Sequence, residues 1–207
     1  MGDGAVRAMS DSVAAAEPLV SRDRSRWAVV AALTLWGLGY VCYRAYYAAG
    51  GEFGMIGRPV SDAQFRTVNA AGAGIVLFAA VLPGVLVRLA ALRPAVPVLG
   101  WLGAVGCCMH ALVDIVLRLL SVAGVYPTQL PEDFWLSFDR TSADLQDLLL
   151  NEPWFFVEGV LWAVLGMACV RTARRRAWLV SFACACLVLT GVGVLSGLGV
   201  IGSFYLG

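Results

Sequence analysis

Long apolar runs alternate with short polar connections along most of this chain. Each run is long enough for a helix, which rises about 1.5 Å per residue, to cross a hydrocarbon core about 30 Å thick. There are five of them, at residues 27–49, 67–92, 96–123, 153–170 and 178–205. The pattern predicts an all-α, polytopic membrane bundle with five transmembrane helices.

Composition agrees with this prediction. Of 207 residues, 60% are hydrophobic and 14% are charged, whereas a soluble domain has about 25% charged residues. The net charge of +1 gives no general attraction to nucleic acid. We therefore expect a multi-pass protein of the plasma membrane, surrounded by membrane lipid and without a nucleic-acid partner.

Three polar segments flank the apolar runs. Residues 1–26 are Ala-rich and mixed in charge, which predicts a flexible cytoplasmic tail before a transmembrane domain at 27–207. Loop 50–66 contains Gly and Pro, which argue against a long helix. Loop 124–152 is acidic, and within it residues 133–150 have apolar side chains at helical spacing. This stretch predicts a surface helix or a cap over a cavity, with a solvated acidic loop as the alternative.

Arginine sets the expected orientation. All fifteen basic residues are Arg, and ten fall on one side of the predicted membrane: Arg7, Arg22, Arg24, Arg26, Arg88, Arg93, Arg171, Arg174, Arg175 and Arg176. The positive-inside rule then places the amino terminus inside and the carboxyl terminus outside. Loops 50–66 and 124–152 become outer loops.

The cysteines and the last apolar run carry no evident chemistry. All six cysteines lie in apolar runs, where Cys acts as a small hydrophobe, so we expect no disulfide framework. They lack the spaced Cys and His pairs of a zinc site, and we expect no metal and no cofactor. The last run is rich in Gly, which predicts close helix packing or a homo-oligomer formed through this helix.

Ionisable residues inside the runs are the main candidates for function. His110, Asp114 and Arg118 follow one another at four-residue intervals and share one helix face. Charges at membrane depth are costly and usually face a protein interior or a wet cavity. His110 lies about 21 Å along the helix from the inner start of its run, so the stripe falls in the outer half.

Polar and aromatic residues of the other runs reach the same level. Glu158 lies about 8 Å below the outer start of the fourth run, on one face with Trp154 and Trp162. The first two runs add a group near their outer ends: Tyr43, Arg44, Tyr47 and Asn69. We predict that Glu158 shares an outer-leaflet pocket with His110, Asp114 and Arg44. Candidate substrate-binding residues around it are Arg44, Asn69, Trp154, Trp162, Tyr43, Tyr47 and Arg118.

A purely structural role is the alternative for these charges. Arg44 and Arg118 could neutralise Asp114 and Glu158 and so fix the register of the helices. Arg118 by itself is better explained in this way, because its long side chain can reach the membrane interface. Four ionisable residues at one depth nevertheless favour function.

The chemistry that suits such a pocket is proton-initiated. A carboxylic acid in a low-dielectric site has a raised pKa and can stay protonated. Aromatic walls can stabilise a developing cation through their faces. These properties predict chemistry on an alkene or epoxide that enters from the lipid.

Two short motifs resemble known membrane enzymes. GCCMHALVD at 106–114, followed by FVEGVLWAVLG at 156–166, resembles the emopamil-binding-protein (EXPERA) sterol isomerases. In that pattern a His and an acid four residues later precede another acid on the next helix, which implies a catalytic set of His110, Asp114 and Glu158. Residues 100–170 carry the resemblance, although position 114 is Asp in place of Glu and fewer helices follow. The spacing N-x-x-W-x-x-x-E is similar to the acidic helix of integral-membrane terpene cyclases.

The leading hypothesis is a membrane enzyme that cyclises or isomerises a lipophilic isoprenoid or sterol-like substrate. Glu158 would be the general acid, Asp114 with His110 a proton relay, and Arg44 a ligand for a polar head or diphosphate. The alternatives are a non-catalytic accessory subunit and a carrier or transporter component for a lipophilic ligand.

Overall fold

The computed structural model describes residues 3–128 and 134–202, with side chains described from residue 24 onward. Five helical segments are long and apolar enough to cross a membrane, which confirms the predicted number. Their helices are α1 (Asp3–Ala48), α2 (Asp62–Arg88), α3 (Val96–Val122), α5 (Glu152–Cys169) and α6 (Arg175–Gly197). The shorter elements are β1 (Gly57–Pro59), the 3₁₀ turns η1 (Ala90–Ala95) and η3 (Thr172–Arg174), β2 (Trp135–Phe138), α4 (Arg140–Gln146) and the π-helical turn η2 (Asp147–Asn151).

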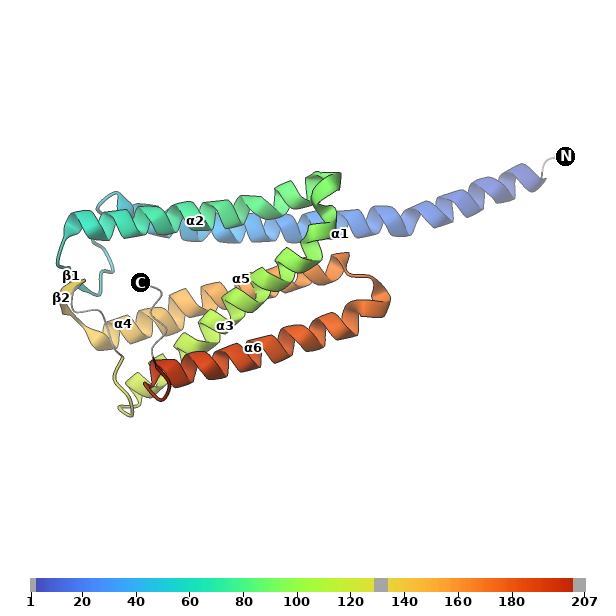
Figure 1. Ribbon diagram of the computed structural model, residues 1–207. Coiled ribbons are helices and arrows are strands. Elements are labelled where there is room, and N and C mark those ends of the chain that lie inside the picture. Colours follow the sequence, from blue (N-terminus) through green and yellow to red (C-terminus); the bar gives the residue numbers. More distant parts are fainter. Residues whose placement is uncertain (1–2, 129–133, 203–207) are drawn as a thin grey trace.

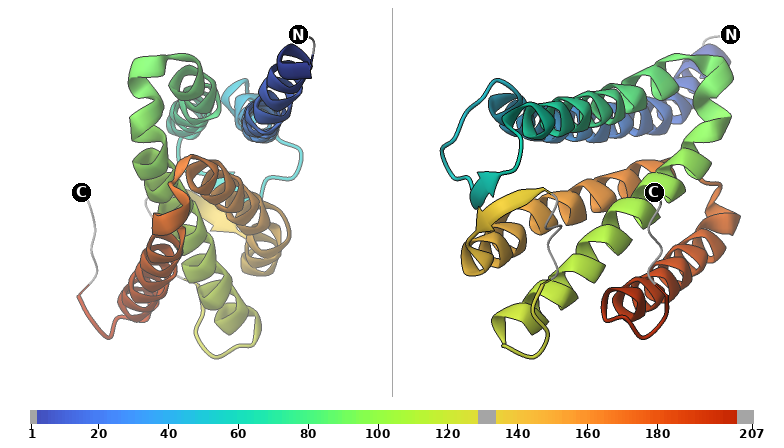
Figure 2. Two further views of the ribbon diagram at one scale, coloured as in Figure 1. Left: turned by 90° about the vertical axis from the view of Figure 1, so that its right-hand side faces the viewer. Right: turned by 60° about the vertical axis from the view of Figure 1, so that its left-hand side comes forward.

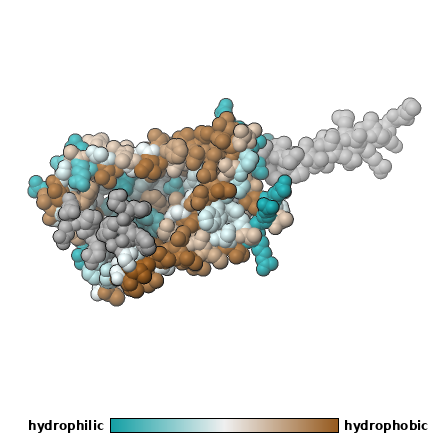
Figure 3. All heavy atoms as spheres, in the orientation of Figure 1, coloured by the Kyte–Doolittle hydropathy of each residue, from teal (hydrophilic) through white to brown (hydrophobic). Residues whose placement is uncertain are grey.

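The helices are arranged as two pairs and an outer helix. α1 lies along α2, α3 crosses α5, and α6 packs mainly on α3 (Figures 1 and 2). Contacts between α1 and α5 join the pairs. We call the end that carries β1 and β2 the sheet end, and the end with connections 88–97 and 170–177 the arginine end. Figure 3 shows mostly hydrophobic residues between these ends.

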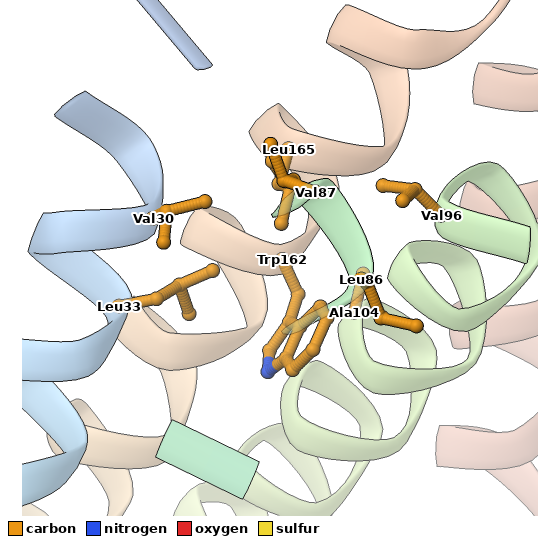
Figure 4. Packing of buried hydrophobic residues seen from close by; sticks show 8 residues of the cluster. All are labelled: Val30, Leu33, Leu86, Val87, Val96, Ala104, Trp162 and Leu165. Atoms are coloured by element: carbon orange, nitrogen blue, oxygen red, sulfur yellow. The ribbon is translucent and has the colours of Figure 1, made fainter. Parts of the chain in front are cut away.

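The core lies where the two pairs meet. Figure 4 shows eight buried residues from four helices, with Trp162 among them: Val30, Leu33, Leu86, Val87, Val96, Ala104, Trp162 and Leu165. Trp162 is 4% exposed. The structure thus places this predicted substrate-binding residue in the core, because its ring fills the space beside Gly103.

Small residues bring α3 and α5 close together. A Cβ added to Gly100 would lie 2.7 Å from the Cα atom of Gly166, and one added to Gly159 would lie 2.5 Å from the sulfur of Cys108. Lipid tails are as apolar as Leu, so helices in a membrane associate through close packing of this kind.

The amino-terminal segment is helical, and the flexible tail stays a prediction. α1 begins at Asp3 and continues without a break into the first apolar run (Figure 1). Ala and Arg, which have high helix propensity, make up nine of the 26 residues before Trp27 and favour this extension.

The two predicted outer loops meet in a small sheet that the sequence pattern did not predict. β1 pairs antiparallel with β2, with Gly57 opposite Phe138 and Arg58 opposite Ser137. The first loop is shorter than predicted, because Ser61 caps α2 at Asp62. The pattern did not predict this sheet because its strands are too short to show a clear alternation of apolar and polar residues.

The helix predicted at 133–150 has different ends in the structure. It starts at Arg140, after the Asp139 cap, where hydrogen bonds from Ser142 lower the pKa of the Asp139 carboxyl. It then continues through η2 into α5, so that 140–169 is one membrane-length helix. Asn151 followed by Pro153 is typical of the start of a helix and predicts a cap at Asn151. In the structure Asn151 lies inside this helix, where its side-chain amide donates a hydrogen bond to Asp147. Residues 129–133 lie outside the described part of the chain.

The small residues of α6 are partly used within the chain. An added Cβ at Gly193 or Gly197 would meet Val113 or Leu117 of α3 at 2.6 Å, whereas Gly191 faces open space. Close packing on α3 therefore explains part of the Gly pattern. A homo-oligomer through the remaining face stays a prediction.

Candidate functional site

A group of three ionisable side chains lies between α3 and α5, toward the sheet end. The Nε2 atom of His110 is 3.6 Å from Oδ2 of Asp114 and 3.9 Å from Oε2 of Glu152. The side chain of His110 is 50% exposed, that of Asp114 is 28% exposed and that of Glu152 is 4% exposed. Phe155 meets the imidazole edge-on, with ring centroids 5.0 Å apart. We call His110, Asp114 and Glu152 the His110 cluster.

A second group lies farther along α3. Arg118 reaches Asp147 at 2.7 Å and Asp144 at 3.4 Å. The Asp144 carboxylate accepts hydrogen bonds from the hydroxyls of Ser121 at 2.5 Å and Thr128 at 2.8 Å. We call Arg118, Asp144 and Asp147 the Arg118 cluster. Its charges are paired and hydrogen-bonded, as in a structural ion-pair network that holds α4 and η2 on α3.

The two clusters differ in how their carboxylates are satisfied. Within the described part of the chain, no side chain donates a hydrogen bond to Asp114 or Glu152, and the buried Oε2 of Glu152 has no hydrogen-bond partner. A buried carboxylate without donors is costly unless it takes up a proton or binds a cation. The His110 cluster is therefore the part of this region whose carboxylates are left to take up a proton or to bind a cation.

Charge counting supports the same conclusion. The two clusters hold four carboxylates, from Asp114, Asp144, Asp147 and Glu152, against one guanidinium and one imidazole. With Arg44 from the adjacent pocket added and His110 protonated, the sum is −4 + 3, which leaves one negative charge in excess. Bound protons or a bound cation can balance it.

The residues predicted near the ends of the first two runs do come together. Arg44 donates through Nη1 to Oδ1 of Asn69 at 2.9 Å. They line a pocket of about 130 Å³ that also involves Asp147 and Asn151, together with Tyr43 and Tyr47. The hydroxyl of Tyr40 donates to Oδ1 of Asn151 at 3.2 Å and so connects this pocket to the Arg118 cluster. The pocket is smaller than the several hundred Å³ usual for a ligand site.

Glu158 is placed apart from His110 and Asp114. It is 5% exposed, and it follows Glu152 by six residues, or about 9 Å of helix rise. The position beside the imidazole that the sequence analysis gave to Glu158 is taken by Glu152. The physical reason is the close crossing at Gly159, which turns Glu158 into the α3–α5 contact.

Trp154 contributes to helix packing in this region. Its ring stacks on Trp36 of α1 with centroids 4.2 Å apart, and its carbonyl accepts a hydrogen bond from the Trp36 indole at 3.0 Å. The contact joins α1 to α5 beneath the Tyr40 ring. Among the described residues, no hydrogen bond or ring contact joins Trp154 to the His110 cluster.

Sequence reasoning missed Glu152, Asp144, Asp147 and Phe155. A signal was present, because Asp144, Asp147 and Asn151 are spaced i, i+3 and i+7 and would form one stripe on a helix. The predicted cap at Asn151 started the fourth helix too late, and so it separated Asp144 and Asp147 from that helix. Pro153 favoured this cap because proline lacks an N–H donor and is common in the first turn of a helix. In the structure the helix continues past Pro153, with the π-helical turn η2 directly before α5.

The His110 cluster also has the composition of a metal site. One ligand atom from each of its three residues lies within 4.8 Å of the others. Tetrahedral zinc with bonds of about 2.0–2.2 Å places its ligands about 3.4 Å apart. The two His110 distances of 3.6 and 3.9 Å exceed this by a few tenths of an ångström.

Comparisons of the chain with protein-family models, with curated proteins and with solved structures find no match. Its class is given by the fold itself: a helical membrane protein with five helices long enough to span a bilayer.

Proposed function

We propose that this protein is an integral enzyme of the plasma membrane that isomerises or cyclises a lipophilic isoprenoid or sterol-like substrate by acid-initiated chemistry. The observation that supports the proposal is the His110 cluster, in which two carboxylates without hydrogen-bond donors flank one imidazole. A site of this kind can hold a proton on a carboxyl group and pass it on. In this proposal Glu152 takes the role of general acid that the sequence motif gives to Glu158.

The reaction is balanced without a cofactor. The carboxyl proton of Glu152 adds to one carbon of a substrate double bond, which leaves a cation on the other carbon. Loss of a proton from a neighbouring carbon to Asp114 or to the imidazole of His110 forms the new double bond. Attack on the cation by a second double bond before this loss would close a ring. A proton transfer from Asp114 through His110 to Glu152 then restores the acid.

The exposure of His110 indicates how a substrate would arrive. Half of its side chain is exposed although it lies inside a membrane-length helix. A lipophilic molecule in the bilayer can therefore approach the cluster sideways, against the ring of Phe155. Aromatic faces stabilise cations by about 0.5–2 kcal/mol.

A metal-dependent reaction at the same cluster is the second candidate, and the spacing of the three ligand atoms favours it. His110, Asp114 and Glu152 would hold a divalent ion, leaving a fourth position for water or substrate. The ion would supply Lewis-acid chemistry, and the excess negative charge of the region would favour its binding.

Incorporation of deuterium from solvent tests the proposal. The purified protein in lipid nanodiscs would be incubated in D₂O with polyprenols, polyprenyl epoxides and sterols, and the products analysed by mass spectrometry. Protonation of a carbon–carbon double bond places a solvent deuteron on carbon. We expect Glu152→Gln to lower this incorporation by about 100-fold or more, the usual contribution of a general acid.

Glu158→Gln is the matched control, because it removes a buried carboxylate from the same helix outside the cluster. It should keep most of the activity. If Glu158→Gln is inactive and Glu152→Gln is not, the original assignment of the acid is right. Activity that depends on added zinc and is lost with a chelator would favour the metal candidate. A folded wild-type protein that labels no substrate would contradict catalysis and favour the carrier or subunit alternatives.

A further inference from the structure

A groove at the arginine end is unrelated to the His110 cluster. It lies where η1 and the start of α3 meet the end of α5 and the start of α6, and its volume is about 810 Å³. This is within the range of ligand sites. Its lining residues combine cationic and apolar side chains: Arg93, Pro97, Val170, Arg171, Arg174 and Trp178.

The cations of this groove are available to a ligand. The connections 88–97 and 170–177 contain six Arg and no acidic residue. Arg93, Arg171 and Arg174 are exposed, and none of the acids in the described part of the chain forms an ion pair with them. Arg93 uses its Nε to hold the carbonyl of Val87 at 2.9 Å. Figure 3 shows hydrophilic residues gathered at this end.

The wall of the groove is apolar and held in place. The ring of Trp178 stacks on Phe182 with centroids 6.0 Å apart, and its indole N–H donates to the carbonyl of Pro97 at 3.0 Å. The hydrogen bond to Pro97 joins α6 to α3, and the two contacts together hold the ring beside Pro97 and Val170. A ligand that fills the groove therefore meets positive charge at its rim and an aromatic, apolar surface along its length.

A smaller pocket continues the groove toward α1. Its volume is about 300 Å³, and it shares Arg93, Pro94 and Cys169 with the groove. Arg26 and Trp27 lie on its far side. The positive rim thus extends along the end of the bundle, where membrane-length helices end and lipid headgroups lie.

We propose that this groove binds an anionic phospholipid, with its phosphate at Arg93, Arg171 and Arg174 and an acyl chain against Trp178. Charge complementarity selects an anion, because the rim is positive and carries no acid. The apolar wall selects an amphiphile over free phosphate, which could use the rim alone. The planar guanidinium of Arg can donate two parallel hydrogen bonds to two phosphate oxygens, which the ammonium group of Lys cannot match.

Lipid retention measured by native mass spectrometry tests this site. The protein would be reconstituted in nanodiscs with equal amounts of phosphatidylglycerol and phosphatidylcholine, then released, and the lipids that stay bound counted. The wild type should retain phosphatidylglycerol preferentially. In the double variant Arg171→Gln with Arg174→Gln, the preference for phosphatidylglycerol over phosphatidylcholine should fall about 25-fold. The reason is that each basic residue near an anionic lipid contributes about fivefold.

Two matched variants separate the site from general charge. Arg66→Gln with Arg140→Gln removes the same charge from exposed residues at the sheet end and should leave the preference unchanged. Arg171→Lys with Arg174→Lys keeps the charge and should retain part of the preference for phosphatidylglycerol. Equal retention of both lipids by the wild type would overturn the proposal, as would a preference that survives Arg171→Gln with Arg174→Gln. Displacement of the lipid by millimolar inorganic phosphate would show that the site binds phosphate alone. It would overturn the proposal that an acyl chain contacts Trp178.

Discussion

At the scale of single residues, four carboxylates at the sheet end fall into two pairs that differ in their partners. Asp144 and Asp147 have a guanidinium and hydrogen-bond donors, whereas Asp114 and Glu152 have an imidazole. Residue type does not distinguish the two classes; the difference is which donors reach each side chain. One pair is therefore suited to hold the fold, and the other to hold and move a proton or bind a cation.

Removal of the Arg118 guanidinium should test whether the Arg118 cluster stabilises the fold. Arg118→Met leaves Asp144, which is 2% exposed, and Asp147 without their cation. Breaking a buried pair in this way destabilises a protein by about 3–5 kcal/mol. We expect a clearly lower Tm in nanodiscs than for Arg66→Met, which changes an exposed residue of the same type.

Removal of the partner charge as well gives a sharper test. Arg118→Met combined with Asp147→Asn should recover part of the lost stability, because loss of both partners is less unfavourable than loss of one. A Tm for Arg118→Met equal to that of Arg66→Met would mean that the Arg118 cluster does not hold α4 and η2 in place.

At the scale of elements, the crossing of α3 and α5 positions the site. The glycines at this crossing let the two backbones approach, and the approach brings Glu152 to His110 while it buries Glu158 at the contact. The length of the helix from α4 to α5 matters equally, because it carries the Arg118 partners and Glu152 on one rigid rod. Element boundaries thus decide which acid reaches the imidazole.

A glycine replacement at the crossing should separate these helices. Gly100→Leu places a side chain where Gly166 leaves no room, and an overpacked site of this kind costs about 1–3 kcal/mol or more. Gly106→Leu, on the same helix but facing open space, is the matched control. We expect a lower Tm for Gly100→Leu alone. Equal Tm values for the two variants would show that α3 and α5 do not cross at Gly100.

At the scale of the whole molecule, the two ends have opposite character. The arginine end is basic in both connections, and the sheet end carries the acids and the β1–β2 pairing. This asymmetry predicts that the arginine end is cytoplasmic. The proposed phospholipid groove would then lie in the inner leaflet, and the His110 cluster in the outer half of the membrane.

Cysteine labelling in intact cells should establish this orientation. A membrane-impermeant maleimide should label Phe53→Cys, at a loop residue that is 89% exposed, without cell lysis. Arg174→Cys should react only after lysis, and the wild type, which has six cysteines of its own, gives the background. The reverse pattern would invert the topology and place the His110 cluster near the cytoplasm.

The apolar runs alone predict the number of membrane-length helices, because each run is long and apolar enough for one helix to cross a bilayer. The sequence also identified the His110–Asp114 pair, since both lie on one helix at a spacing that the helix geometry fixes. The third member was decided only by tertiary structure. Which acid of the 140–169 helix meets His110 depends on where α3 and α5 cross, on the π-helical turn before Pro153, and on a two-stranded sheet between distant loops. These are contacts between segments, and the local pattern of a chain does not contain them.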